Sequence, residues 1–180
     1  MTNDPPPQGA RNVEIKARVA ELAAVESRAA TLAGSGPFDL AQDDTFFNCA
    51  NGRLKLRELA ADRGELIHYE RPDLGGPKVS NYLIATTPEP AALREALSRA
   101  WGVSGRVLKQ RRLYLLGRTR IHLDRVEGLG DFLELEVVLE PEQSVADGEA
   151  EARRIMAALG VAEDDLVSGA YVDLLAALKR

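Results

Sequence analysis

The chain has 180 residues, 45% of them hydrophobic and 28% charged, which is enough apolar material for one well-buried domain core. The formal net charge of −5 argues against a broad nucleic-acid-binding surface, because such a surface usually makes a domain basic. No stretch approaches the roughly eighteen consecutive apolar residues that a membrane-spanning helix needs. We therefore expect one cytoplasmic globular domain that binds neither nucleic acid nor membrane.

The first ten residues, MTNDPPPQGA, are proline-rich and lack the apolar segment of a secretory signal. We expect residues 1–10 to be a disordered leader and residues 11–180 to form a single domain. The only cysteine, Cys49, cannot form an internal disulfide, which suits a reducing cytoplasm. It has no metal-ligating neighbours in the sequence, so we expect a buried, small apolar side chain.

The first half of the domain is predicted to consist of strands around one helix. Residues 12–19, NVEIKARV, alternate polar and apolar side chains, which is typical of a strand with two different faces. Apolar residues at helical spacing follow over 19–34. Four further strand candidates come next, at 43–49, 52–59, 65–72 and 78–85. The Asn51-Gly52 turn between the first two predicts a hairpin, and the series predicts an antiparallel meander.

The second half follows a loosely similar plan. A helix is predicted over 87–102, because early prolines precede an apolar stripe. Three strands follow, at 106–117, 119–128 and 131–140, and two helices close the chain, at 145–160 and 169–180. About eight strands and four helices predict an α+β fold, with helices packed on an antiparallel sheet or barrel.

Charge gathers on one face of the predicted strands. Alternation places nine basic residues on this face: Lys16, Arg18, Arg53, Lys55, Arg57, Arg71, Lys109, Arg111 and Arg120. It also places four acidic ones there: Glu14, Asp124, Glu134 and Glu136. This face either lies open to water or closes on itself as the lining of a barrel. A dry lining is excluded, because so many buried charges would outweigh the roughly 5 to 15 kcal/mol by which domains are stable.

These residue types suit phosphate chemistry. Arginine and lysine bind phosphate oxygens, arginine through two parallel hydrogen bonds. The carboxylates would repel phosphate unless a hard cation such as Mg²⁺ or Mn²⁺ lay between them. Glu14, Glu134 and Glu136 are therefore predicted to form a metal cluster opposite a phosphate-binding surface.

Several short motifs occur in a fixed order between about residue 12 and residue 175. They are Asn12-Val13-Glu14-Ile15-Lys16, the basic strand GRLKLRE, Lys109-x-Arg111, HLD ending in Asp124, and Glu134-x-Glu136 after a Gly-Leu-Gly turn. This set resembles the CYTH, or triphosphate tunnel metalloenzyme, family, which includes class IV adenylyl cyclases and thiamine triphosphatases. The first-strand signature of that family is Glu-x-Glu-x-Lys, so Asn12 stands here in place of the first glutamate.

The resemblance implies an eight-stranded, antiparallel, closed β-barrel with a charged lumen, flanked by about four helices. It implies Glu14, Lys16 and Glu136 as catalytic residues, and the other eight basic residues of the charged face as phosphate ligands. The implied ligands of Mg²⁺ or Mn²⁺ are Glu14, Glu134, Glu136 and Asp124, although Asp124 could instead pair with Arg120. His122 could assist proton transfer or be a structural histidine bonded to a carboxylate.

The implied function is cleavage of a small-molecule triphosphate: ATP, thiamine triphosphate or inorganic triphosphate. Attack by water would make the protein a triphosphatase, and attack by the ribose hydroxyl of ATP would make it an adenylyl cyclase. Two other hypotheses stay open: a non-catalytic nucleotide or polyphosphate sensor, favoured by Asn12, and a plain interaction domain. The sequence leaves the oligomeric state open, with a homodimer as one option.

Overall fold

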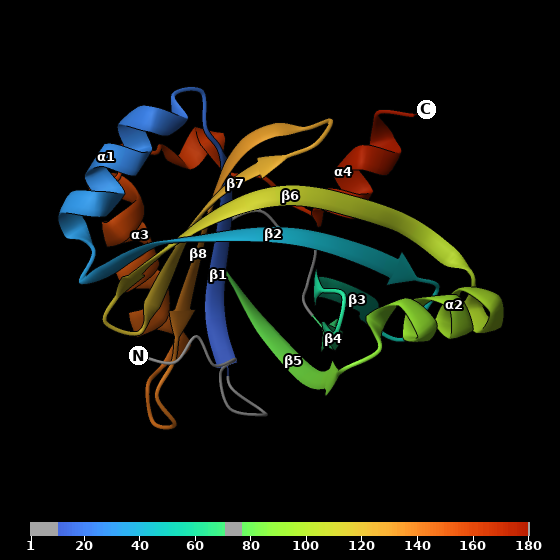
Figure 1. Cartoon of the computed structure of the whole chain (residues 1–180). Helices are drawn as coiled ribbons and strands as arrows, with labels where there is room; N and C mark the ends of the chain where they lie inside the picture. Colours follow the sequence, from blue (N-terminus) through green and yellow to red (C-terminus); the bar gives the residue numbers. More distant parts are fainter. Residues whose placement is uncertain (1–10, 71–76, 180) are drawn as a thin grey trace.

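The computed structural model of the chain describes residues 11–70 and 77–179. The expected leader, residues 1–10, and Arg71 lie outside these residues. Eight strands form a closed barrel, shown in Figure 1. They are β1 (Arg11–Arg18), β2 (Ser35–Phe47), β3 (Arg53–Ala60), β4 (Arg63–Glu70), β5 (Lys78–Thr87), β6 (Val103–Leu116), β7 (Thr119–Val126) and β8 (Gly130–Val138).

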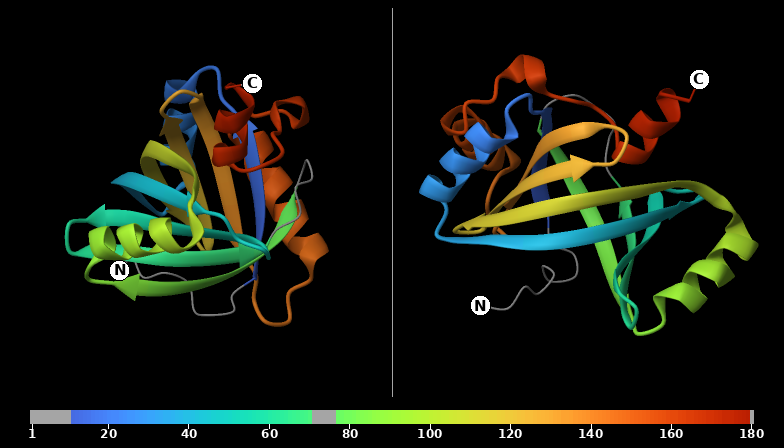
Figure 2. Two further views of the ribbon diagram at one scale, coloured as in Figure 1. Left: turned by 90° about the vertical axis from the view of Figure 1, so that its right-hand side faces the viewer. Right: turned by 45° about the horizontal axis from the view of Figure 1, so that its top comes forward.

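Helices pack around the outside of the barrel. They are α1 (Leu22–Leu32), α2 (Pro90–Trp101), α3 (Val145–Ala158) and α4 (Tyr171–Ala177), with a short 3-10 helix, η1 (Glu163–Asp165). Helices α1 and α3 lie together on one side, and α2 lies apart from them beyond β3 and β4 (Figure 2). The predicted α+β fold, a closed antiparallel barrel with four α-helices, is confirmed for the described residues.

The barrel order is β1-β5-β4-β3-β2-β6-β7-β8, with every neighbouring pair antiparallel. Strands β2 to β5 form the predicted meander, and β6 to β8 form a second one. Long strands β2 and β6 join the two meanders on one side, and β1 joins them on the other by pairing with β5 and β8. Residues from both halves of the chain therefore line one interior.

The alternation of β1 separates the core from the barrel interior. Val13, Ile15 and Ala17 are buried on the outer face, in a core with apolar residues of β7, β8, α1 and α3. Asn12, Glu14 and Lys16 face the interior. The main hydrophobic core thus lies outside the barrel wall, and the predicted charged face is the one that closes on itself.

Helix α3 packs closely against the wall. Its first turn is capped by Ser144, whose hydroxyl oxygen accepts a hydrogen bond from the backbone N–H of Asp147. One turn along, a Cβ atom on Gly148 would lie 2.5 Å from Leu139 Cδ2 and 2.9 Å from Val13 Cγ2. Glycine at this position therefore permits the close approach that buries β1.

Two expectations differ from the structure. Strand β2 begins at Ser35 rather than at 43, because Gly36 and Pro37 obscure a strand whose first half pairs with β6. The expectation that Cys49 is buried is wrong: it is exposed in the turn after β2, where its Sγ contacts Asn51 O at 2.9 Å. In the part of the chain described, no helix is long and apolar enough to cross a membrane.

Candidate functional site

The barrel encloses a cavity of about 490 Å³ lined by side chains from all eight strands. The basic lining residues are Lys16, Lys55, Arg57, Arg63, Lys109, Arg111 and Arg120. The acidic ones are Glu14, Asp44, Glu65, Glu134 and Glu136. The lumen is charged, as expected, but its excess of positive charge is smaller than strand alternation predicts. Asp44 and Glu65 also face it, whereas Arg18 and Arg53 do not.

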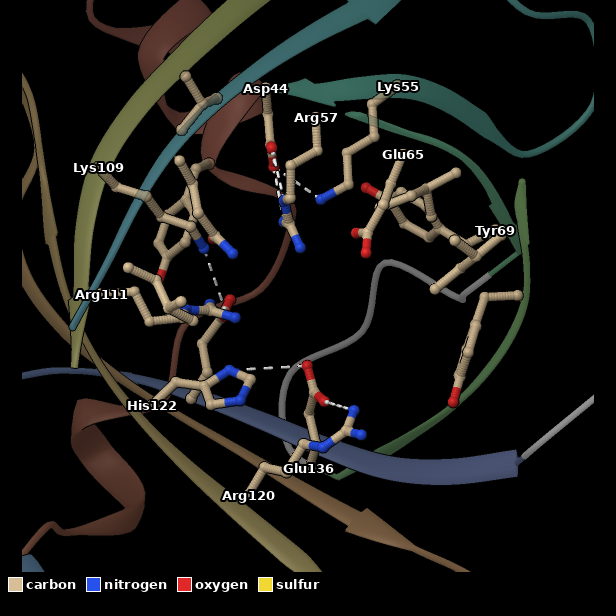
Figure 3. A pocket seen from close by; sticks show the side chains of 18 of the residues that line it. Asp44, Lys55, Arg57, Glu65, Tyr69, Lys109, Arg111, Arg120, His122 and Glu136 are labelled. Atoms are coloured by element: carbon tan, nitrogen blue, oxygen red, sulfur yellow. Dashed lines mark hydrogen bonds and ion pairs between the residues drawn. The ribbon is translucent and has the colours of Figure 1, made fainter. Parts of the chain in front are cut away.

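Asp44 holds two basic residues of the neighbouring strand. It lies directly across the β2–β3 ladder from Arg57 and is almost fully buried. Arg57 donates from Nε to Oδ1 and from Nη2 to Oδ2, and Lys55 donates from Nζ to Oδ2, all at 2.8 Å. We name Asp44, Lys55 and Arg57 the β3 clamp. All three side chains line the cavity, as Figure 3 shows.

Asp124 makes the same three contacts on the neighbouring strand pair, β6 and β7. It lies directly across the β6–β7 ladder from Arg111, which donates from Nε to Oδ1 and from Nη2 to Oδ2, both at 2.6 Å. Lys109 donates from Nζ to Oδ2 at 2.8 Å. We name Asp124, Lys109 and Arg111 the β6 clamp. Lys109 and Arg111 line the cavity, and Asp124 is completely buried behind them.

The two clamps are close enough to affect one another electrostatically. Burial lowers the pKa of Lys55 to about 8, with further lowering by Arg57 and Lys109 that Asp44 only partly offsets. Burial acts to raise the pKa of Asp44, but Arg57, Lys55 and Lys109 outweigh it and hold this pKa below its usual range. The cationic groups of the clamps therefore repel each other around a shared space, which is a favourable position for an anion.

A pair of glutamates lies beside the clamps. Glu14 on β1 and Glu136 on β8 are direct cross-strand partners, and both line the cavity. Burial and the charge of Glu14 raise the pKa of Glu136. On the other side, Glu136 lies 3.6 Å from Arg120 and 3.7 Å from His122 Nδ1. Two like charges placed directly opposite are unfavourable, and a cation is the group that would relieve them.

Glu134 has different surroundings, although it is only two residues away. Its Oε1 lies 3.2 Å from Lys16 Nζ, and its Oε2 accepts a hydrogen bond from Arg111. Burial acts to raise the pKa of Glu134, but Lys16, Lys109 and Arg111 hold it well below its usual range. In this structure Glu134 is therefore a partner of the basic residues.

Four buried polar atoms of the lining have no hydrogen-bond partner among the described residues: Asn12 Oδ1, Gln42 Oε1, Tyr82 Oη and His122 Nδ1. Burial and Arg111 lower the pKa of His122 well below its usual value, so its imidazole is neutral. Burial and Glu136 raise the pKa of Tyr82 to about 12, so its phenol keeps its proton. The atoms of Asn12, Tyr82 and His122 lie on the strands that carry the glutamate pair or on the strands next to them, whereas Gln42 lies on β2.

The start of α4 forms an end wall of the cavity. Tyr171 lines the cavity and packs edge-on against Phe132, with the two ring centres 4.9 Å apart. Its hydroxyl donates a hydrogen bond to Asp124 Oδ2 at 3.1 Å. Lys16 Nζ lies 3.9 Å from the centre of the Tyr171 ring and donates to Gly169 O at 3.1 Å. Lys16 is therefore held at this end of the barrel.

The structure divides the residues predicted for the site. It brings nine of them together on the cavity lining: Glu14, Lys16, Lys55, Arg57, Lys109, Arg111, Arg120, Glu134 and Glu136. Asp124 lies behind this lining. Arg18 is exposed and donates to Leu129 O at 3.2 Å, and Arg53 pairs with Asp173 of α4 at 2.7 Å. Strand alternation predicted the face of Arg18 and Arg53 but not that they lie beyond the cavity.

Sequence reasoning missed three charged residues and one tyrosine of the cavity lining: Asp44, Arg63, Glu65 and Tyr171. Asp44 could have been predicted, because it shares one face of its strand with Gln42 and Phe46. Its neighbour Asp43 obscures the polar–apolar alternation there. Arg63 and Glu65 lie in the first three residues of β4, a strand in which polar and apolar residues alternate poorly. Tyr171 comes from the helix at the barrel end, and strand periodicity carries no information about it.

The fit of a divalent cation can be judged from the oxygen atoms present. Glu14 and Glu136 supply facing carboxylates, and Asn12 supplies a buried carbonyl oxygen on the same face of β1, which are ligands that Mg²⁺ and Mn²⁺ accept. Across the described ranges, no three acidic, histidine or cysteine side chains are already arranged to hold a metal ion. The donor types fit, and the residues would have to adjust to complete a site.

The chain thus belongs to the class of closed antiparallel barrels whose interior is lined by both basic and acidic side chains. The profile of the CYTH domain matches residues 10–171, so the chain belongs to the CYTH family. No curated protein matches the chain.

Solved structures share the fold. The PH1012 protein from Pyrococcus horikoshii is 25% identical, with a TM-score of 0.81 and coverage of 91% of this chain and 99% of the other. A proposed adenylate cyclase from Vibrio parahaemolyticus is 19% identical, with a TM-score of 0.79 and coverage of 94% and 99%. HpAC1 from Hippeastrum, a proposed adenylyl cyclase with a dominant triphosphatase activity, is 16% identical, with a TM-score of 0.64 and coverage of 92% and 95%.

Proposed function

We propose that this protein is a metal-dependent enzyme that binds a triphosphate in the barrel cavity and cleaves one of its phosphate bonds. The observation that carries this proposal is the placement of Lys55, Arg57, Lys109 and Arg111 around one space, beside the Glu14–Glu136 pair. A linear triphosphate supplies the distributed negative charge that four neighbouring cations require.

The basic residues would bind and orient the phosphate chain. Arginine presents a planar set of donors that matches two phosphate oxygens, and lysine presents a compact charge. Fixed donors of this kind stabilise charge as a phosphorus–oxygen bond breaks, and this is the main help that proteins give to phosphoryl transfer. Lys16, at the closed end, and Arg120, beside Glu136, would extend the binding surface.

We propose Glu14 and Glu136 as the ligands of a divalent cation, Mg²⁺ or Mn²⁺, with Asn12 Oδ1 as a third oxygen. When bound, the cation would supply positive charge to the phosphate oxygens. Glu134 and Asp124 were also predicted ligands, but both are engaged by lysine and arginine in this structure. We propose that these two carboxylates position basic residues instead.

Two reactions fit the same cavity. In a triphosphatase, water attacks the terminal phosphorus, the bond from that phosphorus to the bridging oxygen breaks, and the diphosphate part leaves while the terminal phosphoryl group becomes orthophosphate. In an adenylyl cyclase, the ribose hydroxyl of ATP attacks the α-phosphorus and pyrophosphate leaves. The reactions differ in the attacking group and in the position of the organic part of the substrate.

A product assay separates these reactions. The purified protein is incubated with ATP, thiamine triphosphate or inorganic triphosphate, with Mg²⁺ or Mn²⁺, and the products are resolved by anion-exchange chromatography. Cyclic AMP with pyrophosphate would identify a cyclase, and orthophosphate a triphosphatase. Glu136→Gln should abolish either activity, whereas Glu140→Gln, a change just after β8 in an exposed pair with Arg118, should not.

A non-catalytic triphosphate sensor is the second candidate. It is favoured by Asn12, which places a neutral amide beside the glutamate pair, and by the engagement of Glu134 with Lys16 and Arg111. Binding of triphosphate without turnover of any substrate would identify a sensor. In that case Asn12→Glu, which adds a carboxylate next to the pair, should create or raise activity.

A further inference from the structure

The β3 clamp and the β6 clamp are built from the same atoms in the same way. In each, an aspartate lies directly across a ladder from an arginine, which donates from Nε and Nη2 to its two carboxylate oxygens. In each, the lysine two residues before that arginine donates to Oδ2. Strand pairing alone does not require the same arrangement to occur twice. We therefore attribute it to the cavity, which the lysine and arginine of each clamp line.

Each aspartate occupies one edge of its arginine. A guanidinium carries five N–H donors and an ammonium three, and the carboxylate takes two of the former and one of the latter. The Nη1 edge of Arg57 and the remaining donors of Lys55 are not used by Asp44. Because both side chains line the cavity, these remaining donors are the ones available to a ligand there.

We propose that Asp44 and Asp124 are positioning residues, which hold the two Lys-x-Arg pairs in the orientation that binds a triphosphate. This inference rests on the proposed function and deepens it. Without such a carboxylate, four neighbouring cations would repel one another and turn toward solvent, and the ligand would have to order them on binding. With it, the donors are already in place.

The alternative is that each aspartate only lowers the positive charge of the cavity. The two possibilities predict opposite results. If Asp44 acted only through its negative charge, its replacement by a neutral residue would make the cavity more positive and would tighten anion binding. If it positions Lys55 and Arg57, neutralisation will weaken binding.

The test is calorimetric titration of the full chain with inorganic tripolyphosphate in metal-free buffer at neutral pH. We expect Asp44→Asn to raise the Kd about tenfold, because charge-assisted hydrogen bonds that orient the donors are lost. The matched control is Asp43→Asn. Asp43 is the next residue on β2 and pairs on the outer face with Arg106 and Arg94, so its replacement should leave the Kd unchanged.

The pH dependence of binding gives a readout that a general loss of stability would not produce. Burial and three charged groups set the protonation of Lys55: burial and the charges of Arg57 and Lys109 oppose it, and Asp44 favours it. Wild-type affinity should fall as the pH rises through about 8, and in Asp44→Asn this fall should occur at lower pH. A purely structural defect would weaken binding equally at all pH values.

Two further variants keep the test decisive if Asp44→Asn fails to fold, as judged by circular dichroism. Asp44→Glu keeps the negative charge but displaces the carboxylate. It should raise the Kd, while affinity should still fall at about the same pH as in the wild type. Asp124→Asn should raise the Kd as Asp44→Asn does, whereas its control Asp131→Asn, in a surface pair with Arg125, should not.

The outcomes separate this inference from the proposed function. Tighter or unchanged binding by folded Asp44→Asn, or wild-type affinity in Asp44→Glu, would overturn the positioning role while triphosphate binding by the wild type stands. Absence of binding by the wild type itself would overturn the proposed function, and the inference with it.

Discussion

Glu14 and Glu136 face each other directly across the β1–β8 ladder on the cavity side of the barrel. Burial and Glu14 raise the pKa of Glu136, so its charged form is unfavourable in the folded protein. We expect Glu136→Gln to stabilise the metal-free protein by about 1 kcal/mol, or a few degrees in Tm. Differential scanning calorimetry in the presence of a chelator measures this change.

The same variant tests the cation proposal. Mg²⁺ or Mn²⁺ should raise the Tm of the wild type, because a ligand that binds only the folded state stabilises it. This rise should be lost in Glu136→Gln and kept in Glu140→Gln. An equal rise in all three proteins would place the cation elsewhere.

The depressed pKa of Lys55 predicts opposite effects of pH on stability and on binding. Its folded-state value of about 8 lies below the ordinary 10.5, so the unfolded chain binds more protons between these two values. The stability of the ligand-free protein should therefore rise with pH across this window, by at most about 1.4 kcal/mol per pH unit from this one group. Tripolyphosphate affinity should fall across the same window.

Lys55→Arg is the control for this pair of measurements, because arginine keeps its proton throughout the window. The difference in urea-unfolding free energy between wild type and Lys55→Arg isolates the contribution of Lys55. If the two proteins show the same slope with pH, Lys55 does not titrate in this window.

The location of a positive charge should matter more than its presence. Arg120→Ala, on the cavity lining, should raise the Kd for tripolyphosphate several-fold, as expected for loss of a charge-assisted contact. Arg18→Ala removes the same charge from an exposed site and should change the Kd by less than about twofold at physiological salt. Equal effects of the two variants would show that binding responds only to net charge.

Tyr171 should stabilise the end wall through both its ring and its hydroxyl. Tyr171→Phe loses the hydrogen bond to Asp124 and should cost about 1 kcal/mol of unfolding free energy. Tyr171→Ala also loses the packing on Phe132 and should cost about 3 kcal/mol or more. Urea titrations measure both, and similar values for the two variants would mean that the ring contributes little.

The fold was predictable because polar and apolar residues alternate along the strands, which distinguishes the two faces of each strand in the sequence. In β1 the polar residues Asn12, Glu14 and Lys16 alternate with Val13 and Ile15, and this period of two fixes which side chains share a face. The same rule placed Lys55 with Arg57, and Lys109 with Arg111. It failed at Ser35, where a glycine and a proline hide the start of a long strand.

It was less predictable which residues of one face reach the cavity and which charged side chains meet there. Alternation assigns Arg18 and Lys16 to one face, but only the structure shows that Arg18 lies beyond the cavity while Lys16 contacts Tyr171. Which carboxylate meets which cation depends on strand register, and register is a property of pairing between strands. Glu134 and Glu136 therefore look equivalent in the sequence and have opposite pKa shifts in the structure.

The main hydrophobic core of this protein lies outside the barrel wall, and the charged residues of the candidate site line its interior. In β1, for example, one face packs in this core and the other lines the cavity, with a single layer of backbone between them. We therefore expect interior residues to tolerate replacement with little damage to this core, provided that they change in charge-balanced sets such as Asp44 with Lys55 and Arg57. A change of ligand would then require new side chains on the inner face of the barrel and not a new main core.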